Sequence, residues 1–235
     1  MSTNEVRHVA VTGAGGGIGR AIALALLEEG MLVWLIGRDR DKLEHVAKQG
    51  HGRARLISAD LATSDGISKV AAALGPRLDV LVHSAGGYLR GDWASIGADE
   101  WAALERVNLH APLLLTAACL PGLRAARGQV VFVNSSAGLR AAAGVGAYAA
   151  SKHALKAAAD ALRQEVNGDG IRVLSIFPGR TDTAMQREIL AMEQRTAPYG
   201  TLLRPEDVAS MVIAALKLPA TAEVTDIMMR PVQAL

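Results

Sequence analysis

Short apolar runs alternate along the chain with longer stretches of helical spacing. Several of these runs lack polar alternation, which is typical of parallel strands that are buried on both faces. The predicted strands span residues 8–12, 32–36, 54–58, 79–83, 129–134, 172–176 and 224–228. Helices are predicted between them at 18–29, 40–48, 65–74, 99–125 (in one or two pieces), 147–166 and 205–217. This alternation predicts a doubly wound α/β fold, with a largely parallel seven-stranded sheet and helices on both faces.

Composition limits the classes of protein that fit this pattern. A chain of 235 residues without repeat or linker predicts a single domain over 1–235. The 25 basic and 23 acidic residues are interspersed, so no nucleic-acid surface is expected. The first residues lack the apolar core of a signal peptide, and the most apolar run, 111–120, is too short to cross a bilayer. We therefore expect a cytoplasmic protein that has neither nucleic acid nor membrane as a partner.

A glycine-rich turn, TGAGGGIG at 12–19, joins the first predicted strand to the first helix. Glycines allow a close backbone approach to a phosphate, and the free N–H groups of a helix N-terminus attract anions. The G-x-G-x-x-G fingerprint fails because its last position is Ile18, whereas Gly13, Gly17 and Gly19 fit G-x-x-x-G-x-G. The context favours a dinucleotide site in a Rossmann-type domain over a merely flexible turn, with Gly13, Gly17, Ile18 and Gly19 as the residues that bind the cofactor.

The end of the second strand bears on the choice of cofactor. A terminal carboxylate there would bind the adenosine ribose and indicate NAD, but the strand ends at Gly37 and Arg38 follows. The planar guanidinium of Arg38 suits a 2′-phosphate. Asp39 has two interpretations, a ribose carboxylate or a helix cap, and Asp41 and Glu44 have the spacing of a capping box. We predict NADP, with NAD less favoured.

The third and fourth strands end near the same crevice, because ligands of such sheets bind outside the carboxyl ends of the strands. Asp60 and Leu61 follow the third strand, where Asp60 either shapes the turn or contacts the adenine. Ala85 and Gly86 follow the fourth strand and are small enough to let a cofactor lie across the edge. His83 is interpreted as a hydrogen-bonding residue of the strand end.

Tyr148 and Lys152 lie one helical turn apart, so their side chains project from the same face. An adjacent ammonium favours the phenolate and is expected to lower the pKa of the phenol, which would suit the pair to proton transfer. The alternative is a solvated helix face. The fifth strand leads to Ser135 and Ser136, neither of which lies in a G-x-S-x-G elbow, so a hydrolase nucleophile is excluded. A serine hydroxyl here is better suited to bind a substrate oxygen.

Together these motifs resemble the short-chain dehydrogenase/reductase family in its compact form. The likeness covers nearly the whole chain, and Ser135 is favoured over Ser136 because it begins a Ser-x-x-Gly and precedes Tyr148 by thirteen residues. The matching segments are TGAGGGIG, VNLHAP around Asn108, Ser135 with Gly138, Tyr148-x-x-x-Lys152, Pro178-Gly179-Arg180-Thr181-Asp182-Thr183 and RPEDVA at 204–209.

The resemblance implies roles for the catalytic residues. Tyr148 would be the general acid or base, Lys152 would lower its pKa and contact the nicotinamide ribose, and Ser135 would orient the substrate oxygen. Asn108 would hold a helix kink and a water that links Lys152 to solvent; its alternative is a helix-interior Asn with local hydrogen bonds. The implied reaction is NADP(H)-dependent transfer of hydride between nicotinamide and a carbonyl or secondary alcohol, without a metal.

The same resemblance implies how the cofactor and substrate are bound. Thr181 and Thr183, after Pro178 and Gly179, would meet the nicotinamide end and the pyrophosphate, and Arg38 would bind the 2′-phosphate. Segments 87–90, 139–145 and 184–203 would select the substrate, the last as an amphipathic lid whose alternative is ordinary surface packing. Arg140 is a weaker candidate for binding an acidic group of the substrate, since a solvated arginine is the more common case.

Two departures from the family pattern stand out. His83-Ser84 replaces the usual Asn-Asn, and Gly16 stands where NADP-preferring members often carry a basic residue.

Two other functions are alternatives to an NADP(H)-dependent oxidoreductase. A non-catalytic NADP(H)-binding redox regulator would not need Ser135, Tyr148 and Lys152 together. Related epimerases or dehydratases generally need an added substrate domain, for which the chain has no room. By resemblance, we expect a homotetramer or homodimer that pairs through helices 99–125 and 147–166.

Overall fold

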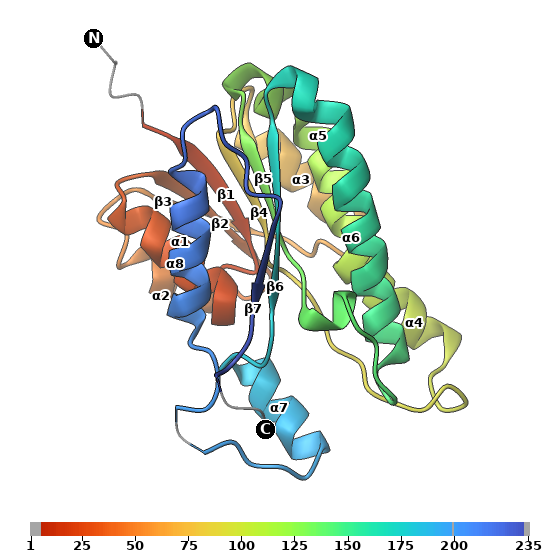
Figure 1. Cartoon of the computed structure of the whole chain (residues 1–235). Coiled ribbons are helices and arrows are strands. Elements are labelled where there is room, and N and C mark those ends of the chain that lie inside the picture. The colour runs from red at the N-terminus through yellow and green to blue at the C-terminus, as the bar shows by residue number, and fades with distance from the viewer. Residues whose placement is uncertain (1–5, 199, 233–235) are drawn as a thin grey trace.

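The structure is a computed structural model that describes residues 6–198 and 200–232. Its sheet has seven strands, all parallel, in the order β3-β2-β1-β4-β5-β6-β7 (Figure 1). The chain reverses its direction of winding between β1 and β4, and such a reversal is where open α/β sheets bind ligands. The strands are β1 (His8–Thr12), β2 (Leu32–Gly37), β3 (Ala54–Ser58), β4 (Val80–His83), β5 (Gln129–Val133), β6 (Arg172–Pro178) and β7 (Asp226–Met229). The predicted doubly wound fold is confirmed.

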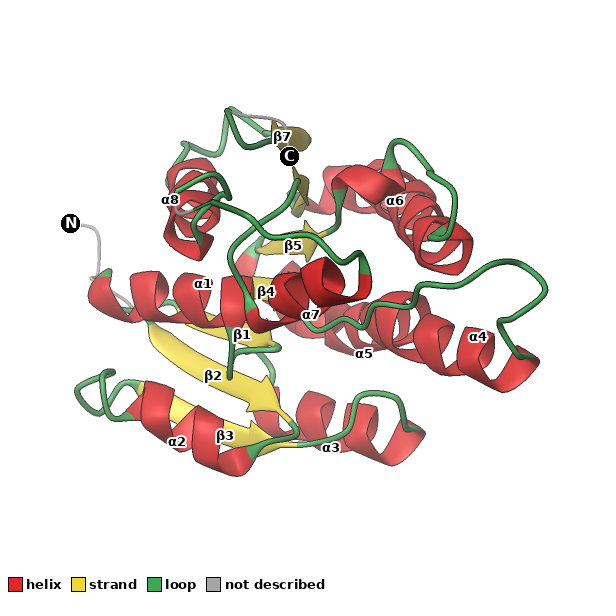
Figure 2. Cartoon of the chain, turned by 90° about the horizontal axis from the view of Figure 1, so that it is seen from below, coloured by secondary structure: helices red, strands yellow, loops and turns green. Residues whose placement is uncertain are grey.

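Helices cover both faces of the sheet (Figures 1 and 2). One face carries α1 (Gly17–Glu28), α2 (Arg40–Ala47) and α8 (Pro205–Leu216). The other carries α3 (Ser64–Leu74), α4 (Ala98–Glu105), α5 (Ala111–Ala126) and α6 (Gly146–Val166). Each layer buries its own hydrophobic cluster against the sheet.

Successive residues of the central strands point alternately into the hydrophobic clusters on the two faces of the sheet. Val9 and Val11 of β1 point into the cluster beneath α1 and α8, whereas Ala10 between them points into the opposite cluster. In β5, Val131 and Phe132 divide in the same way. This twofold alternation of buried side chains explains why the strands read as continuous apolar runs.

The predicted helix 99–125 is one continuous helix that contains a wider turn. Helix α4 passes through a π-helical turn, Arg106–His110, directly into α5. The whole helix, Ala98–Ala126, is long and apolar enough by length and composition to cross a membrane, as a core helix of a soluble protein also can be. The apolar run 111–120, judged too short to span a bilayer, is therefore part of a longer helix, whose α5 portion packs against α3 and the sheet.

A further helix, α7 (Ala184–Met192), lies in the segment 184–203, which the apolar pattern did not identify as helical. Thr183 caps it by accepting a hydrogen bond from the Gln186 backbone N–H at 3.1 Å. Figure 1 shows α7 below the sheet, and the end view in Figure 2 shows it in front of the central strands. Residue 199 of the segment 184–203 lies outside the described residues.

Candidate active site

The glycine turn after β1 packs so closely that side chains would not fit. A Cβ on Gly13, which has φ +69°, would lie 2.8 Å from the backbone N of Ala85, and a Cβ on Gly19 would collide with the Gly13 carbonyl. A Cβ on Gly17, with φ +51°, would meet the Thr183 Cγ2 atom at 3.0 Å. The predicted G-x-x-x-G-x-G spacing therefore follows from close contacts to β4, to the turn itself and to the cap of α7.

The N-terminus of α1 opens from this turn. Gly16 is its N-cap and provides no side-chain hydrogen bond, and the first turn of the helix has no acidic residue. The first N–H groups of a helix lack intrahelical acceptors and carry the positive end of the helix dipole. With the glycine turn beside it, this helix end fits a cofactor phosphate.

Thr12 ties the ends of β1 and β4 together. Its buried hydroxyl accepts hydrogen bonds from the backbone N–H groups of Ser84 (3.0 Å) and Ala85 (3.1 Å). The next residue, Gly86, lies against the catalytic candidates, since a Cβ there would be 3.2 Å from Asn108 Oδ1 and 3.9 Å from Lys152 Nζ. The predicted cofactor-lining pair Ala85 and Gly86 is thus next to the glycine turn.

Asn108 is fully buried in the π-helical turn. Its Oδ1 accepts from Gly87 N–H at 2.8 Å, while its Nδ2 donates to the Gly87 carbonyl and to Ser151 Oγ, both at 3.1 Å. Widened turns of this kind are frequent at functional sites, because they redirect a side chain out of the helical register. Asn108 therefore links the loop after β4 to α6, one residue before Lys152.

Tyr148 and Lys152 lie in the first two turns of α6. The Lys152 ammonium is buried, donates a hydrogen bond of 3.1 Å to the Val133 carbonyl, and lies 6.0 Å from the centroid of the Tyr148 ring. The ring of Tyr88 packs against the ring of Tyr148, with ring centroids 5.0 Å apart. Tyr88 belongs to the segment 87–90 that was expected to select the substrate, but its contact with Tyr148 was not predicted, because it joins a loop to a helix that is distant along the chain.

Burial sets the acidity of both groups. Desolvation raises the pKa of the Tyr148 phenol, a hydrogen bond with Ser135 opposes that rise, and Tyr88 adds to it. Burial also lowers the pKa of Lys152 to about 8. The expectation that the ammonium lowers the Tyr148 pKa is therefore wrong for the protein without ligands: desolvation of the phenolate is the largest effect there.

Asn134, directly after β5, is a site residue that the sequence pattern predicted only as the end of a strand. Its Nδ2 donates to the Lys152 carbonyl at 3.1 Å, and its Oδ1 accepts from the Ser135 N–H at 2.8 Å. The Ser135 hydroxyl accepts a hydrogen bond from Ala137 N–H at 3.1 Å. A polar residue at the carboxyl end of a wholly buried strand is the signal that could have identified Asn134.

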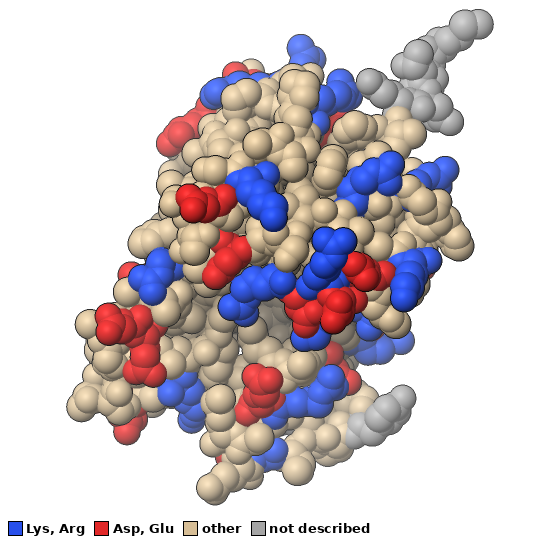
Figure 3. Space-filling view, turned by 180° about the vertical axis from the view of Figure 1, so that it is seen from behind, with Lys and Arg blue, Asp and Glu red and all other residues tan. Residues whose placement is uncertain are grey.

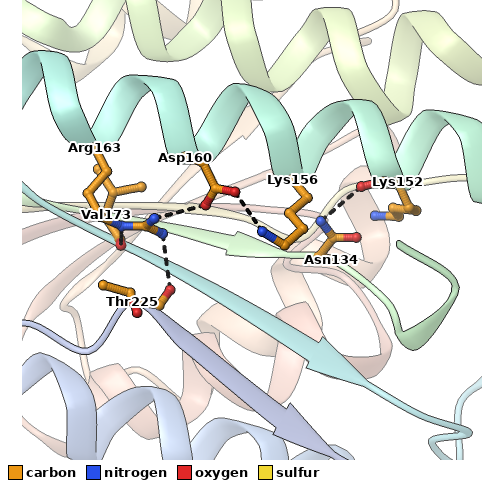
Figure 4. Close-up of polar contacts among 7 residues, drawn as sticks. All are labelled: Asn134, Lys152, Lys156, Asp160, Arg163, Val173 and Thr225. Atoms are coloured by element: carbon orange, nitrogen blue, oxygen red, sulfur yellow. Dashed lines mark hydrogen bonds and ion pairs between the residues drawn. The ribbon is translucent and has the colours of Figure 1, made fainter. Parts of the chain in front are cut away.

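A row of polar contacts fixes α6 on the sheet (Figure 4). Arg163 donates to the carbonyls of Val173 (3.0 Å) and Thr225 (3.1 Å), and its third contact is Asp160 at 2.9 Å. Asp160 also accepts from Lys156 at 2.6 Å. These contacts and the Asn134–Lys152 hydrogen bond lie along one side of α6, which orients the first turns that carry Tyr148 and Lys152.

A cavity of about 280 Å³ lies beside Ser135 and Tyr148. Of the predicted site residues, Ile18, Ser135, Tyr148, Pro178, Gly179, Thr181 and Thr183 line it. Most of its remaining walls come from the segments expected to select the substrate, including Tyr88 and Arg90, Ala142 and Val145, and Met185, Gln186, Ile189 and Glu193. Asn134, Ser136, Ala137 and Arg180 complete the lining. Arg140 is exposed and is not among the lining residues, whereas Arg90 and Arg180 are.

The adenosine-side candidates lie at the ends of β2 and β3, outside this cavity. Arg38 is exposed, and its carbonyl accepts a hydrogen bond of 3.1 Å from Ser58 Oγ. Asp60 shapes the turn after β3, accepting from the Ala62 N–H at 3.0 Å, and Leu61 is buried. The structure thus gives Asp60 the role of a turn residue.

Of the two interpretations of Asp39, a ribose carboxylate or a helix cap, the structure shows the helix cap. Asp39 is the N-cap of α2, accepts from the Lys42 N–H at 3.1 Å and pairs with the Lys42 ammonium. Asp41 and Glu44 form no capping box, because Asp41 is already inside the helix and Glu44 pairs with Arg40 at 2.8 Å. The carboxylate nearest to Arg38 in the sequence is therefore engaged in capping.

His83 has a structural role at the end of β4. Its ring is buried, stacks on Phe132 with centroids 5.1 Å apart, and is hydrogen-bonded through Nε2 to Thr116 Oγ1 at 2.7 Å. Desolvation lowers the pKa of His83 to about 3. The imidazole is therefore neutral at physiological pH, as expected of a hydrogen-bonding strand-end residue.

Charges of both signs are interspersed on the face seen in Figure 3. Within the described ranges, no group of three or more His, Cys, Asp or Glu side chains is arranged to hold a metal ion. The ionisable side chains that line the cavity are two phenols, two guanidiniums and the carboxylate of Glu193, with several hydroxyl groups among them.

A model of the short chain dehydrogenase family matches residues 7–194 of the chain. The chain therefore belongs to the short-chain dehydrogenase family. An uncharacterized oxidoreductase of Staphylococcus aureus (strain N315) is 34% identical over 227 residues, which cover 94% of this chain and 96% of the relative.

Solved structures of other oxidoreductases superpose on almost the entire chain. An alcohol dehydrogenase from the archaeon Thermococcus sibiricus, complexed with 5-hydroxy-NADP, is 25% identical with a TM-score of 0.88, covering 97% of both chains. A metagenomic short-chain oxidoreductase in complex with NADP is 31% identical with a TM-score of 0.82, covering 97% of this chain and 98% of the other. This short-chain dehydrogenase thus shares its fold with enzymes that bind NADP.

Proposed function

We propose that this short-chain dehydrogenase is an NADP(H)-dependent oxidoreductase that interconverts a carbonyl compound and the corresponding secondary alcohol. The observation that carries the proposal is the convergence of Ser135, Tyr148 and Lys152 beside a cavity that Ile18 of the glycine turn also lines. Two different parts of the chain supply these groups: α6 carries the phenol of Tyr148 and the buried ammonium of Lys152, and the segment after β5 carries the hydroxyl of Ser135.

NADP(H) is the proposed cofactor. The glycine turn and the free N-terminus of α1 suit its pyrophosphate, together with Thr183, which touches Gly17 in the fold. Arg38, exposed at the end of β2, is proposed to bind the 2′-phosphate, and Asp60, Leu61, Ala85 and Gly86 to border the adenosine and ribose. Pro178, Gly179 and Thr181 would border the nicotinamide, which supplies or accepts the hydride when bound.

Tyr148 is the proposed general acid or base. In reduction, its phenol gives a proton to the substrate oxygen while the carbonyl carbon gains a hydride; in oxidation, both transfers reverse. Ser135, whose hydroxyl counteracts the rise in the pKa of Tyr148, would bind the substrate oxygen and hold it in line. Lys152 would favour the phenolate once substrate and cofactor exclude water, and Asn108 would fix α6 and the loop at Gly87.

The same proposal includes the domain organisation, the segment that covers the substrate and the location of the enzyme. Residues 1–235 are proposed to form one domain, in which segment 184–203 covers the substrate. We place the enzyme in the cytoplasm, with a small molecule as its substrate.

We further propose a homodimer or homotetramer formed through α4–α5 and α6. Ala150, Ala157 and Ala161 are exposed on α6, and Ala154 beside them is partly buried. On α5, Leu114 is 55% exposed. Small side chains allow helices of two subunits to approach closely.

A panel of carbonyl compounds and alcohols, followed by nicotinamide absorbance with NADPH and NADH, tests the proposed function. Tyr148→Phe should abolish turnover and leave NADPH binding largely intact, because only the transferable proton is removed. Ser135→Ala should lower kcat by about 100-fold or more, whereas the neighbouring Ser136→Ala should stay within a few-fold of wild type. Full activity of Tyr148→Phe would refute the assignment, and NADPH binding without turnover of any compound would favour a redox regulator.

A further inference from the structure

Two side-chain donors that line the cavity have no acceptor. Gln186 is only 7% exposed, yet its Nε2 atom has no hydrogen-bond partner among the described residues. Arg180 Nη1 is shielded from solvent and is likewise without a partner there. Buried donors without acceptors cost free energy, so native proteins rarely leave them unless a ligand or water completes them.

The charges around the cavity are unbalanced in the same direction. Arg180 Nη2 binds Glu193 Oε2 at 2.8 Å, and Arg90 Nη1 reaches Oε1 of the same carboxylate at 3.4 Å. The Glu193 side chain is only 11% exposed and faces both guanidiniums. Among the lining residues, two arginines therefore face a single acidic group, which leaves one positive charge uncompensated.

These observations indicate the chemistry of the ligand. Both unpartnered groups are donors only, so the ligand must provide acceptor oxygens, and the excess charge favours an anion over a neutral group. A guanidinium with one free edge binds a carboxylate in the plane of its N–H groups. The cavity volume of about 280 Å³ restricts the ligand to a small molecule.

Resting on the function proposed above, we propose that the substrate is a small oxo or hydroxy acid whose carboxylate is bound by Arg180 and Gln186. Glu193 holds Arg180 in place from the C-terminal end of α7 and ties the helix to Arg90 in the loop after β4. The reacting oxygen of the same molecule meets Ser135 and Tyr148 in the shared cavity. Arg180 and Gln186 are thus specificity-determining residues, and Arg140, which does not line the cavity, is not.

The test compares oxo acids with their methyl esters. The probes are 2-oxo-, 3-oxo- and 4-oxopentanoate and the corresponding esters, with kcat/KM measured from NADPH absorbance. For at least one chain position, the wild-type enzyme should favour the acid by about 10-fold or more, as expected when a charged hydrogen bond is gained. Equal use of acids and esters at every position would overturn the proposal while leaving the oxidoreductase function intact.

Three variants locate the effect. Arg180→Met should lower kcat/KM for the preferred acid by about 10- to 100-fold and change that for the ester less than about threefold. Gln186→Met should cause a smaller loss in the same sense. Arg187→Met is the matched control on α7, because Arg187 is largely exposed and pairs with Asp182 outside the cavity lining. Equal losses for acid and ester, or weaker NADPH binding in place of lost acid preference, would overturn the proposal.

If the enzyme turns over none of the tested compounds, binding can still be measured by calorimetry on the NADP⁺-loaded protein. Binding of an oxo acid, but not its ester, that is lost in Arg180→Met and kept in Arg187→Met would support the carboxylate site even though the proposed function had failed. Indistinguishable binding of acid and ester, or no binding of either, would overturn the proposal.

Discussion

Asn134 Nδ2 donates a 3.1 Å hydrogen bond to the backbone carbonyl of Lys152, which joins the end of β5 to the second turn of α6. The Oδ1 atom of the same side chain accepts from the Ser135 N–H at 2.8 Å. One amide therefore sets the spacing between the serine-bearing loop and the helix that carries Tyr148. Gly138 packs directly against this amide, because a Cβ on Gly138 would collide with Asn134 Oδ1.

Asn134→Ala should disturb both stability and turnover. Removing two buried hydrogen bonds should lower the free energy of unfolding by about 2 kcal/mol, as followed by urea denaturation. We expect kcat to fall by about 100-fold because Ser135 and Lys152 lose their common support. Asn167→Ala is the control, since the one hydrogen bond of the Asn167 side chain within the described ranges is an exposed 3.4 Å contact with Glu223. A variant as active as wild type would contradict the positioning role.

Ionisation of Tyr148 should occur above the ordinary phenol pKa of about 10 in the ligand-free protein. Burial disfavours the phenolate, so the 295 nm absorbance difference between wild type and Tyr148→Phe should develop at a higher pH than for free tyrosine. Ser135→Ala should move this transition still higher, because the Ser135 hydrogen bond lowers the pKa. A transition near neutrality without ligand would show that the Lys152 ammonium outweighs desolvation.

Arg38→Ala should weaken NADPH binding far more than NADH binding, because only NADPH carries the 2′-phosphate. We expect a loss of about 10- to 100-fold in NADPH affinity, measured by fluorescence titration. Arg40→Ala is the matched control, since Arg40 is exposed and engaged by Glu44. Equal losses for both cofactors would remove Arg38 from phosphate recognition.

His83 should make the protein less stable in mild acid. Its pKa is about 3 when folded and about 6.5 when unfolded, so below pH 6.5 the unfolded state binds more protons. Its stabilising contribution is complete above pH 6.5 and falls as the pH decreases toward 3, by about 2 kcal/mol at pH 5. In urea denaturation, His83→Asn should lose less stability between pH 7 and pH 5 than wild type. Identical losses would contradict a buried neutral imidazole.

Sedimentation should show a dimer or tetramer at micromolar concentration. Ala157→Arg places a long charged side chain on the exposed face of α6 and should dissociate the assembly. Ala214→Arg, on exposed α8 surface at the opposite layer, should leave it unchanged. A wild-type monomer would refute the proposed assembly.

Much of the architecture could be predicted from the sequence because its signals are local. A strand buried on both faces must be apolar throughout, so β1, β4 and β5 were identifiable from a few adjacent residues. The spacing of Gly13, Gly17 and Gly19 reports contacts in which no Cβ fits, and the interval from Tyr148 to Lys152 follows from helical geometry. These features need no knowledge of distant segments.

Only the tertiary structure determined how distant groups meet. Asn134 between Ser135 and Lys152, Tyr88 on Tyr148, and Glu193 between two arginines each join segments that no local pattern connects. The Tyr148 pKa is of the same kind: proximity to an ammonium can be read from spacing, but desolvation depends on everything packed around the phenol. Local periodicity thus determined the elements of this protein, whereas burial and long-range contacts, which exist only after folding, determined the chemistry of its cavity.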